Sequence, residues 1–273
     1  MSGAGTAIVT AVLLTWCAAG LGRAAASFPP PEWAYPQTPR PFTPDPDEGT
    51  PKHLSGSTRA YTYQQIEDSF APADWYPNEH RIARALTAEE AKAAITYFAR
   101  LPRTPWIAVI EAEMVPKTRI IEGNLRVPLE PQELEPLGQR IVEVPKFPVR
   151  TRAYDAHAPF VAYVPMGSLR RGRALVTSGG AVMRGKTVVV PGKTAPCTDC
   201  HGPNLQGMAH APDTNIAVPA LSGRSPTYIV RQLYDIQSGA RSGPTTEQMK
   251  PIAAQLTLQE MIDIAAYIGS KTP

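Results

Sequence analysis

Two cysteines and a histidine stand together near position 200, in the order Cys197-Thr198-Asp199-Cys200-His201. The spacing C-x-x-C-H is the attachment signature of c-type haem. Positions i, i+3 and i+4 of a helical turn lie on one face. We therefore expect the two thiols to bond to the two vinyl groups at one porphyrin edge while the imidazole of His201 binds the iron. The predicted cofactor is one covalently attached haem c.

Three other chemistries fit this cysteine pair less well. A zinc site needs two further ligands, and His210 is the only nearby candidate. A thioredoxin-like redox pair belongs in a β-α-β setting, whereas the sequence around the motif has the pattern of helices and loops. A disulfide across two intervening residues is strained and leaves the histidine without a role.

A haem iron with one histidine ligand needs a second axial ligand or an open site. Four downstream side chains carry a suitable atom: Met208, His210, Met249 and Met261. Met208 and His210 follow His201 so closely that a short tether hinders their approach to the opposite haem face. Met261 falls in the apolar stripe of a predicted helix, where packing is its expected role. We predict Met249, in the loop before that helix, as the axial ligand, because a thioether opposite imidazole suits an electron carrier.

Helices are predicted on both sides of Met249. The first begins at Ser225-Pro226, an N-cap followed by proline at the first helical position, and ends at Gly239. The second begins with the capping box Thr257-x-x-Glu260. Apolar residues at helical spacing define their buried faces: Ile229, Leu233 and Ile236, then Met261, Ile264, Ala265 and Ile268. From about residue 167 the expected order is helix, glycine-rich loop, motif, helix, loop, helix.

The preceding segments differ in composition. Residues 27–60 contain a proline-rich run, predicted to be an extended strap or linker. Residues 61–101 have a helical pattern, and residues 82–97 repeat the capping box and apolar spacing of 252–267. Any two capped amphipathic helices would look alike, which is the alternative. Short β-branched runs predict strands and turns over 102–165, at 106–110, 119–121, 140–144 and 160–164.

The first residues predict export. Residues 7–21 form an apolar stretch with the length of a secretory core region, and Ala24-Ala25-Ala26 supplies a small-x-small cleavage site. An uncleaved anchor is the alternative, although the segment is short for one. Cleavage would remove Cys17 and leave one cysteine pair, which suits an oxidising compartment. We therefore expect a signal peptide at 1–26 and a periplasmic location.

The composition allows a folded core, and the sequence gives no sign of binding to nucleic acid or to a small-molecule substrate. Of the 273 residues, 43% are apolar and 19% charged, so a sizeable core is possible. The net charge of +3, with no block of Lys and Arg, gives no reason to expect nucleic-acid binding. No substrate-binding catalytic constellation is recognisable, so no small-molecule substrate is expected.

Together these motifs resemble the class I cytochromes c. The matching stretch spans about residues 167 to 271 and includes Cys197-x-x-Cys200-His201-Gly202, Pro219-x-Leu221-x-Gly223 and Met249-x-Pro251. More narrowly, the chain resembles the two-haem periplasmic cytochromes c of bacteria, in which two such domains follow one another. That resemblance implies that Met249 ligates the iron and that the Pro219 carbonyl orients the histidine that binds the opposite haem face.

The chain departs from that family in its first half. The family's first C-x-x-C-H should lie near residues 80–82, and no cysteine stands there. The resemblance therefore implies a helical remnant of a first cytochrome-like domain at 61–101, a β-rich segment at 102–165 and a cytochrome c domain at 166–273. The expected fold class is mainly α, with that C-terminal helical domain preceded by the remnant and the β-rich segment.

The function expected from the sequence is one-electron transfer. A periplasmic monohaem cytochrome would carry electrons between periplasmic or membrane-bound redox proteins without being an enzyme, because the redox chemistry belongs to the cofactor. Two alternatives are a haem-bearing subunit of a dehydrogenase or oxidase complex and a haem sensor or peroxidase whose sixth ligand is displaceable.

Overall fold

The computed structural model describes residues 31, 33, 85–100, 103–121, 125–131, 133–153, 155, 157–208, 218–242 and 246–273. The predicted signal peptide with Cys17, most of the predicted strap, residues 61–84 and His210 lie outside these residues. None of the helices in the described ranges combines the length and the apolar character that a membrane span requires.

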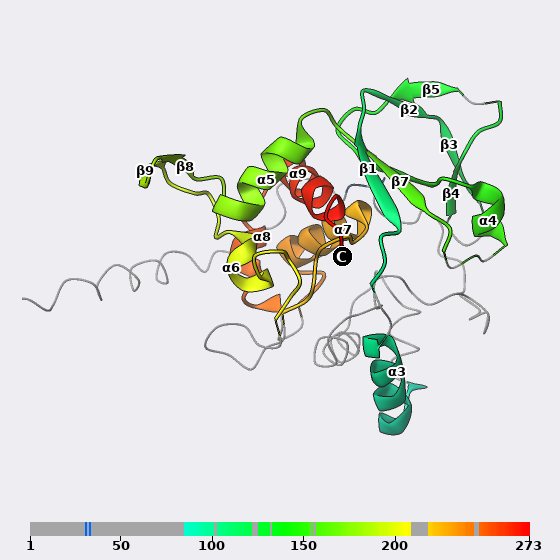
Figure 1. The fold of residues 1–273 in the computed structure, drawn as a ribbon, viewed down its shortest axis with the longest axis horizontal. Helices are drawn as coiled ribbons and strands as arrows, with labels where there is room; N and C mark the ends of the chain where they lie inside the picture. The colour runs from blue at the N-terminus through cyan, green and yellow to red at the C-terminus, as the bar shows by residue number, and fades with distance from the viewer. Residues whose placement is uncertain are drawn as a thin grey trace, which may run out of the picture.

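A lone helix, a β-rich segment and a helical C-terminal part follow one another, which confirms the predicted fold class (Figure 1). The helices are α3 (Ala88–Arg100), α4 (Pro148–Arg152), α5 (Ser168–Ser178), α6 (Cys197–His201), α7 (Pro226–Ser238), α8 (Lys250–Ala253) and α9 (Leu258–Gly269). The strands are β1 (Ile107–Glu111), β2 (Met114–Pro116), β3 (Thr118–Ile121), β4 (Leu125–Pro128), β5 (Leu134–Pro136), β6 (Val142–Pro145), β7 (Phe160–Val164), β8 (Val182–Arg184) and β9 (Thr187–Val190).

The β-rich segment is built around a three-stranded sheet in the order β1-β7-β6. Strand β7 is parallel to β1 and antiparallel to β6, so it is the central strand. The antiparallel pairs β2–β5 and β3–β4 lie beside this sheet (Figure 1). A small hydrophobic cluster fills this part of the fold: Val115, Leu137, Val142 and Val144. The predicted run at 160–164 coincides with β7, and the run at 119–121 lies within β3. The runs at 106–110 and 140–144 begin one and two residues before β1 and β6.

Helices α5 and α9 cross at unusually close range. A Cβ atom added at Gly172 of α5 would lie 1.9 Å from the backbone oxygen of Asp263 in α9. The same crossing carries a bidentate ion pair, in which Arg171 Nε and Nη2 donate to the Asp263 carboxylate over 2.7 and 2.9 Å. Because Asp263 is buried, this pair satisfies a charge that would otherwise be costly inside the protein.

The cap residues of α7 and α9 confirm the sequence predictions. Tyr228 N donates to the Ser225 side chain over 3.1 Å at the start of α7, and Gly239 ends that helix with a φ of 80°. At α9 both halves of the Thr257–Glu260 capping box are present. All seven apolar residues of the predicted stripes are buried: Ile229, Leu233, Ile236, Met261, Ile264, Ala265 and Ile268.

The sheet and the helices share one hydrophobic core. Ile141, Ala162 and Val164 from the β-rich segment belong to the same buried cluster as residues of α5, α7 and α9. Trp33, in the predicted strap, packs against this cluster. The β-rich segment is therefore packed into the helical part of the described chain rather than attached to it by a linker.

Two carboxylates of the sheet cap helices of the C-terminal part. Glu111 of β1 accepts a hydrogen bond of 2.8 Å from Leu169 N, in the first turn of α5. Glu143 of β6 accepts 2.7 Å from Thr227 N and is also bonded to the Ser225 hydroxyl, at the start of α7. Burial raises the pKa of Glu143, while these hydrogen bonds oppose that shift. Carboxylates at helix N-termini satisfy free N–H groups and complement the helix dipole.

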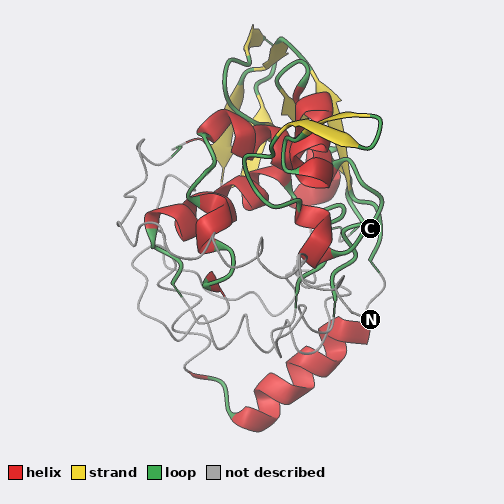
Figure 2. Ribbon diagram, turned by 90° about the vertical axis from the view of Figure 1, so that its left-hand side faces the viewer, coloured by secondary structure: helices red, strands yellow, loops and turns green. Residues whose placement is uncertain are grey.

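Helix α3 lies apart from the sheet and the other helices (Figures 1 and 2). It begins with the predicted capping box, because Glu90 N donates to Thr87 Oγ1 and Thr87 N donates to Glu90 Oε2. Its residues Ala91 and Ile95 are buried, yet they belong to neither hydrophobic cluster.

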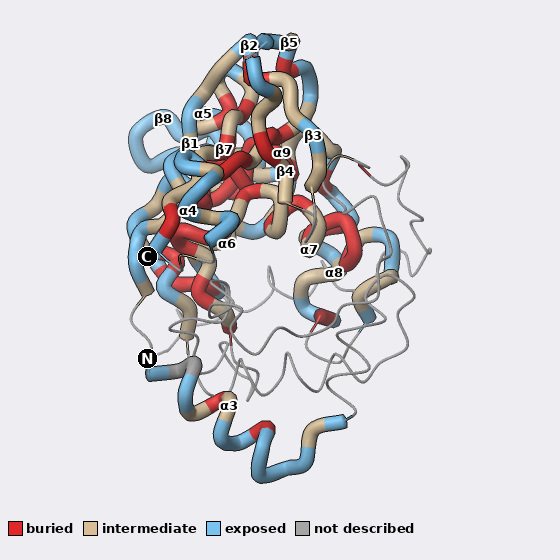
Figure 3. Tube along the Cα trace, turned by 90° about the vertical axis from the view of Figure 1, so that its right-hand side faces the viewer, coloured by how far each residue is buried: buried red, intermediate tan, exposed pale blue. Residues whose placement is uncertain are grey.

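The glycine-rich loop predicted after α5 is in fact a β-hairpin, β8–β9. Gly179, with a φ of 61°, ends α5, and Gly185, with a φ of 63°, lies in the turn between the two strands. The β-branched run Thr187–Val190 favours a strand. The hairpin projects from the helical part of the molecule (Figure 1), and its residues are almost all exposed (Figure 3). The flanking glycines had suggested a loop, whereas two of them in fact form the helix end and the hairpin turn.

The crossing of α5 and α9 predicts a large effect of one methyl group. Gly172→Ala should lower the free energy of unfolding by about 2 kcal/mol, because overpacking at backbone contact outweighs the gain of about 1 kcal/mol in helix propensity. Urea unfolding followed by circular dichroism measures the change. Ala174→Leu, on the exposed face of the same helix, is the control and should change stability by less than about 0.5 kcal/mol. Equal stability of Gly172→Ala and the wild type would contradict the close crossing.

Candidate haem site

Helix α6, which carries both cysteines and His201, is held against the end of α5. Thr198 Oγ1 donates to the carbonyl of Val176 over 3.4 Å. Just before α6, Lys193 N and Thr194 N both donate to the carbonyl of Gly179, over 2.8 and 3.3 Å. The position of the single turn Cys197–His201 is thus fixed by α5, and through α5 by α9.

The His201 ring is arranged as a metal ligand requires. His201 is only 6% exposed, and its Nδ1 lies 2.8 Å from the carbonyl oxygen of Pro219. A carbonyl can only accept a hydrogen bond, so Nδ1 carries the proton and Nε2 keeps its lone pair. Burial lowers the pKa of His201, and the bond to Pro219 opposes this shift, so the ring is neutral at pH 7. This tautomer presents Nε2 to a metal.

The loop after His201 places the Pro219 carbonyl. Leu205 adopts a φ of 58°, a left-handed conformation uncommon for a residue other than glycine. Its carbonyl accepts from Leu221 N over 2.8 Å and Ser222 N over 3.2 Å. Met208 and Val218 pair through two backbone bonds of 3.0 Å. These bonds join the segments on either side of Pro219 to the loop that follows α6.

The environment of the cysteines does not favour a thioredoxin-like redox pair. Cys197 is half-buried and Cys200 is exposed. Burial raises the pKa of the Cys197 thiol to about 11. Thioredoxin-like pairs instead contain a thiol with a lowered pKa, so this environment argues against that alternative. Within the described ranges, which leave out His210, no three His, Cys, Asp or Glu side chains converge as a metal cluster.

The candidate axial ligands occupy different environments. Met249 is half-buried at the start of α8 and packs against the main core, with its backbone N donating 2.9 Å to Thr246 O and its carbonyl accepting 2.8 Å from Ala253 N. Met261 is fully buried within α9. Helices α6 and α8 overlap in the view of Figure 1 but lie apart in Figure 3, which is turned by 90°. Ligation by Met249 remains a prediction.

The donor set of the described residues fits haem c. A helical turn presents two thiols and a correctly protonated imidazole, and a separate short helix offers a half-buried thioether. The sequence pattern identified these donors but not the role of Leu205. Its left-handed backbone has no signature of its own, although the neighbouring Gly202 and Gly207, both with positive φ, mark a tightly turned loop.

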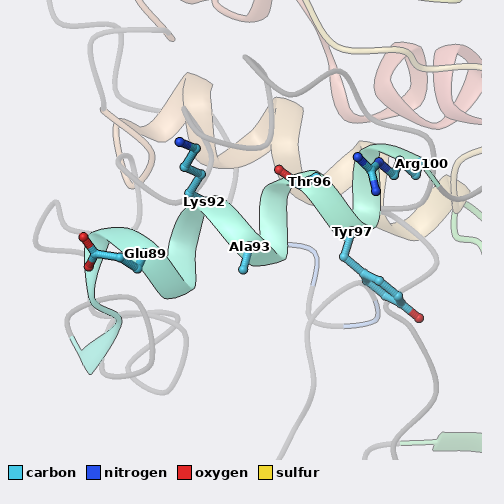
Figure 4. A pocket seen from close by; sticks show the side chains of 6 residues that line it. All are labelled: Glu89, Lys92, Ala93, Thr96, Tyr97 and Arg100. Atoms are coloured by element: carbon cyan, nitrogen blue, oxygen red, sulfur yellow. The ribbon is translucent and has the colours of Figure 1, made fainter.

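A pocket beside α3 is a separate concave feature (Figure 4). The described residues that line it are all on α3: Glu89, Lys92, Ala93, Thr96, Tyr97 and Arg100. None of these described lining residues is a cysteine or a histidine, and we assign no chemistry to the pocket.

Comparisons with known proteins find relatives of the C-terminal part of the chain. The sequence model of the family described as Cytochrome c matches residues 182–272. Cytochrome c-554(548) of Halomonas halodenitrificans is 34% identical over 79 residues, which cover 29% of this chain and 88% of that protein. Cytochrome c4 of Pseudomonas aeruginosa is 35% identical over 115 residues, covering 41% and 54% of the two chains. A protein named thiosulfate dehydrogenase electron acceptor, from Stutzerimonas stutzeri, is 40% identical over 97 residues, covering 36% and 37%.

The chain therefore belongs to the cytochrome c family, and covalently bound haem c is the cofactor that this membership implies. It spans about half of the Pseudomonas aeruginosa cytochrome c4 and 36%, 41% and 45% of three other cytochromes c4 that it matches. The structural match to a solved cytochrome c4 from Pseudomonas stutzeri covers 82% of this chain and 89% of that protein, at 18% sequence identity and with a TM-score of 0.47.

The cysteine pair predicts covalent attachment. Cys200→Ala should lose most of its holoprotein, because one of the two expected thioether bonds cannot form. Haem staining after denaturing electrophoresis and acid-acetone extraction both measure the bond. Asp199→Asn, which keeps the C-x-x-C-H spacing, is the control and should retain the stain. Haem that leaves the wild-type protein on extraction would refute covalent attachment.

Proposed function

We propose that this protein is a one-electron carrier with a single haem c, held by Cys197, Cys200 and His201, with Met249 as the second axial ligand. The observation that carries the proposal is the buried His201 ring, whose Nδ1 proton is committed to Pro219. When bound, haem iron supplies the change between two oxidation states that differ by one electron. The remaining roles belong to the residues of this chain.

Each of these residues has a distinct task in the proposed site. Cys197 and Cys200 anchor the cofactor to α6, and the Pro219 carbonyl keeps the His201 ring in one orientation, which reduces rearrangement between oxidation states. Met249 at the start of α8 would complete the coordination, and a thioether there favours the reduced iron. The shared core of α5, α7 and α9 would exclude water from one side of the site.

One haem per chain follows from the cysteine count. Apart from Cys17, the sequence contains one cysteine pair, and covalent attachment through two vinyl groups requires a pair. Three residues before the repeat at 82–97, the position that matches Met249 is Glu79, a poor ligand for haem iron. We therefore propose that 61–101 is the remnant of a first module, that 102–165 is a β-rich segment and that 166–273 is the haem-binding domain.

We also propose a periplasmic location and redox proteins as partners. The apolar segment and cleavage pattern of residues 1–26, followed by the strap at 27–60, support export. The match to a protein named thiosulfate dehydrogenase electron acceptor supports a dehydrogenase as one class of electron donor. The carrier itself would not be an enzyme.

The haem count tests the single-module proposal. A pyridine haemochrome assay calibrated against protein mass should give a ratio near one, because only one attachment motif is present. Intact-mass measurement of the same sample is the control for the covalent fraction. A ratio near two would mean a second haem held without thioether bonds and would overturn the proposal that the first module has lost its haem.

If Met249 is the axial ligand, its replacement should open the iron to external ligands. Met249→Ala should keep the haem but bind carbon monoxide when reduced, and its potential should fall by on the order of 0.1 V, a fraction of the roughly 0.8 V over which axial ligands act. Absorbance spectra and redox titration measure both effects. Met261→Leu and Met208→Leu are the controls and should behave like the wild type. If Met208→Leu opens the iron instead, the assignment of Met249 is wrong.

A further inference from the structure

The hairpin β8–β9 exposes apolar side chains on both of its faces. Val182 is paired with Val190 and Met183 with Val188, the register shifts between the two pairs, and successive residues of a strand alternate between its faces. The apolar side chains are each 49–53% exposed: Val182, Met183, Val188, Val189 and Val190. A two-stranded ribbon without a covering layer has little stability of its own. Clustered exposed apolar residues of this kind mark interaction surfaces.

The stretch of sequence that contains the hairpin is basic as far as Asp199, an exposed residue of α6. Residues 156–198 contain no Asp or Glu and six cationic residues: Arg170, Arg171, Arg173, Arg184, Lys186 and Lys193. Arg171 pairs with Asp263 and Lys193 with Glu260, both on α9. The other four are exposed, two on the outer face of α5 and two at the tip of the hairpin. A partner that covers the valines would therefore meet uncompensated positive charge around them.

The hairpin is fixed close to the haem attachment helix. Its base is held by the two bonds that Lys193 N and Thr194 N donate to Gly179 O, and by the ion pair of 2.7 Å between Lys193 and Glu260. Seven residue steps separate Val190 from Cys197, which limits the distance between their Cα atoms to about 25 Å. The base of the hairpin therefore lies within about 25 Å of the first residue of α6.

We propose that the β8–β9 hairpin is the docking surface for a redox partner protein whose contact surface carries carboxylates around an apolar centre. This inference rests on the proposed function as an electron carrier. The apolar centre would cover the valines, while the carboxylates would face Arg184 and Lys186 at the tip and Arg170 and Arg173 on α5. Such complementarity raises the rate of productive encounter.

Two other occupants fit the geometry less well. Arg184 and Lys186 lie at the tip of the hairpin, and the valines lie nearer its base. A hairpin that entered a lipid bilayer tip first would therefore bury two charged residues before the valines, whereas interfacial segments place apolar residues deepest. A symmetric dimer would bring the same basic patch of each copy together, and like charges at an interface oppose association. The charge pattern thus favours an acidic protein.

The test uses the full-length holoprotein and two hairpin variants. The first combines Val182→Thr, Val188→Thr and Val190→Thr, which keeps β-branched residues in the strands while removing apolar surface. The second combines Arg184→Gln and Lys186→Gln. The matched control combines Val149→Thr and Arg152→Gln on α4, where Val149 is 80% exposed, on the other side of the molecule (Figure 1).

The partner is identified first, by a photoreactive benzoylphenylalanine in place of Val188 in cells and mass spectrometry of the cross-linked product. Stopped-flow electron transfer between that protein and each holoprotein variant then follows, over a range of ionic strength. We expect an acidic redox protein, with a second-order rate constant that the charge variant lowers by about 3- to 10-fold at low salt and not at high salt. The apolar variant should be slower at every ionic strength, and the α4 control should match the wild type.

Several results would overturn the docking surface. These are a cross-link to lipid, to a second copy or to residues 1–84 of the same chain, the absence of any cross-link, and hairpin variants that exchange electrons like the wild type. Co-sedimentation with vesicles of equal parts phosphatidylcholine and phosphatidylglycerol that the valine variant abolishes would also count against it. Reduction of the holoprotein by ascorbate or dithionite separates the two proposals: its failure refutes the carrier function, whereas normal reduction with unchanged partner rates refutes only the docking surface.

Discussion

The contact between α5 and α9 at Gly172 is the constraint on which the described C-terminal part depends. No side chain separates the two backbones at this point, and the Arg171–Asp263 pair closes the crossing beside it. The end of α5 in turn carries both α6 and the base of the hairpin β8–β9. A shift of α5 relative to α9 would therefore move the attachment helix and the proposed docking surface together. Rigid support of this kind is what a site needs when its geometry must not change during its reaction.

At the candidate site, the hydrogen bond of His201 to a backbone carbonyl plays a similar positioning role. The buried imidazole of His201 has one nitrogen satisfied by a backbone carbonyl and one nitrogen left for coordination. Burying an imidazole costs free energy unless its polar atoms find partners, and the hydrogen bond to the Pro219 carbonyl offsets part of that cost. Leu205, held in a left-handed conformation within the supporting loop, shows that local backbone strain is tolerated where it places that carbonyl.

The sequence predicted those features whose chemistry is local. The caps at Ser225 and Thr257 and the C-x-x-C-H turn depend on residues within a few positions of one another, and they could be placed almost to the residue. Non-local contacts could not be predicted in this way. Glu143 caps α7 from 84 positions away, and the role of the Pro219 carbonyl came only from family resemblance, because a backbone carbonyl has no sequence signature. The hairpin β8–β9 was missed because its glycines resemble those of an irregular loop.

The capping carboxylates of the sheet have a consequence for where the chain can be divided. A fragment starting at residue 166 would retain all the proposed haem ligands and the α5–α9 crossing. It would, however, lose Glu111 and Glu143 and uncover the core face that Ile141, Ala162 and Val164 now protect. Free N–H groups at two helix starts and newly exposed apolar surface both weigh against independent folding. The segment that carries the proposed haem ligands is thus shorter than the segment that we expect to fold by itself. A shortened haem protein made from this chain should therefore keep strands β1, β6 and β7.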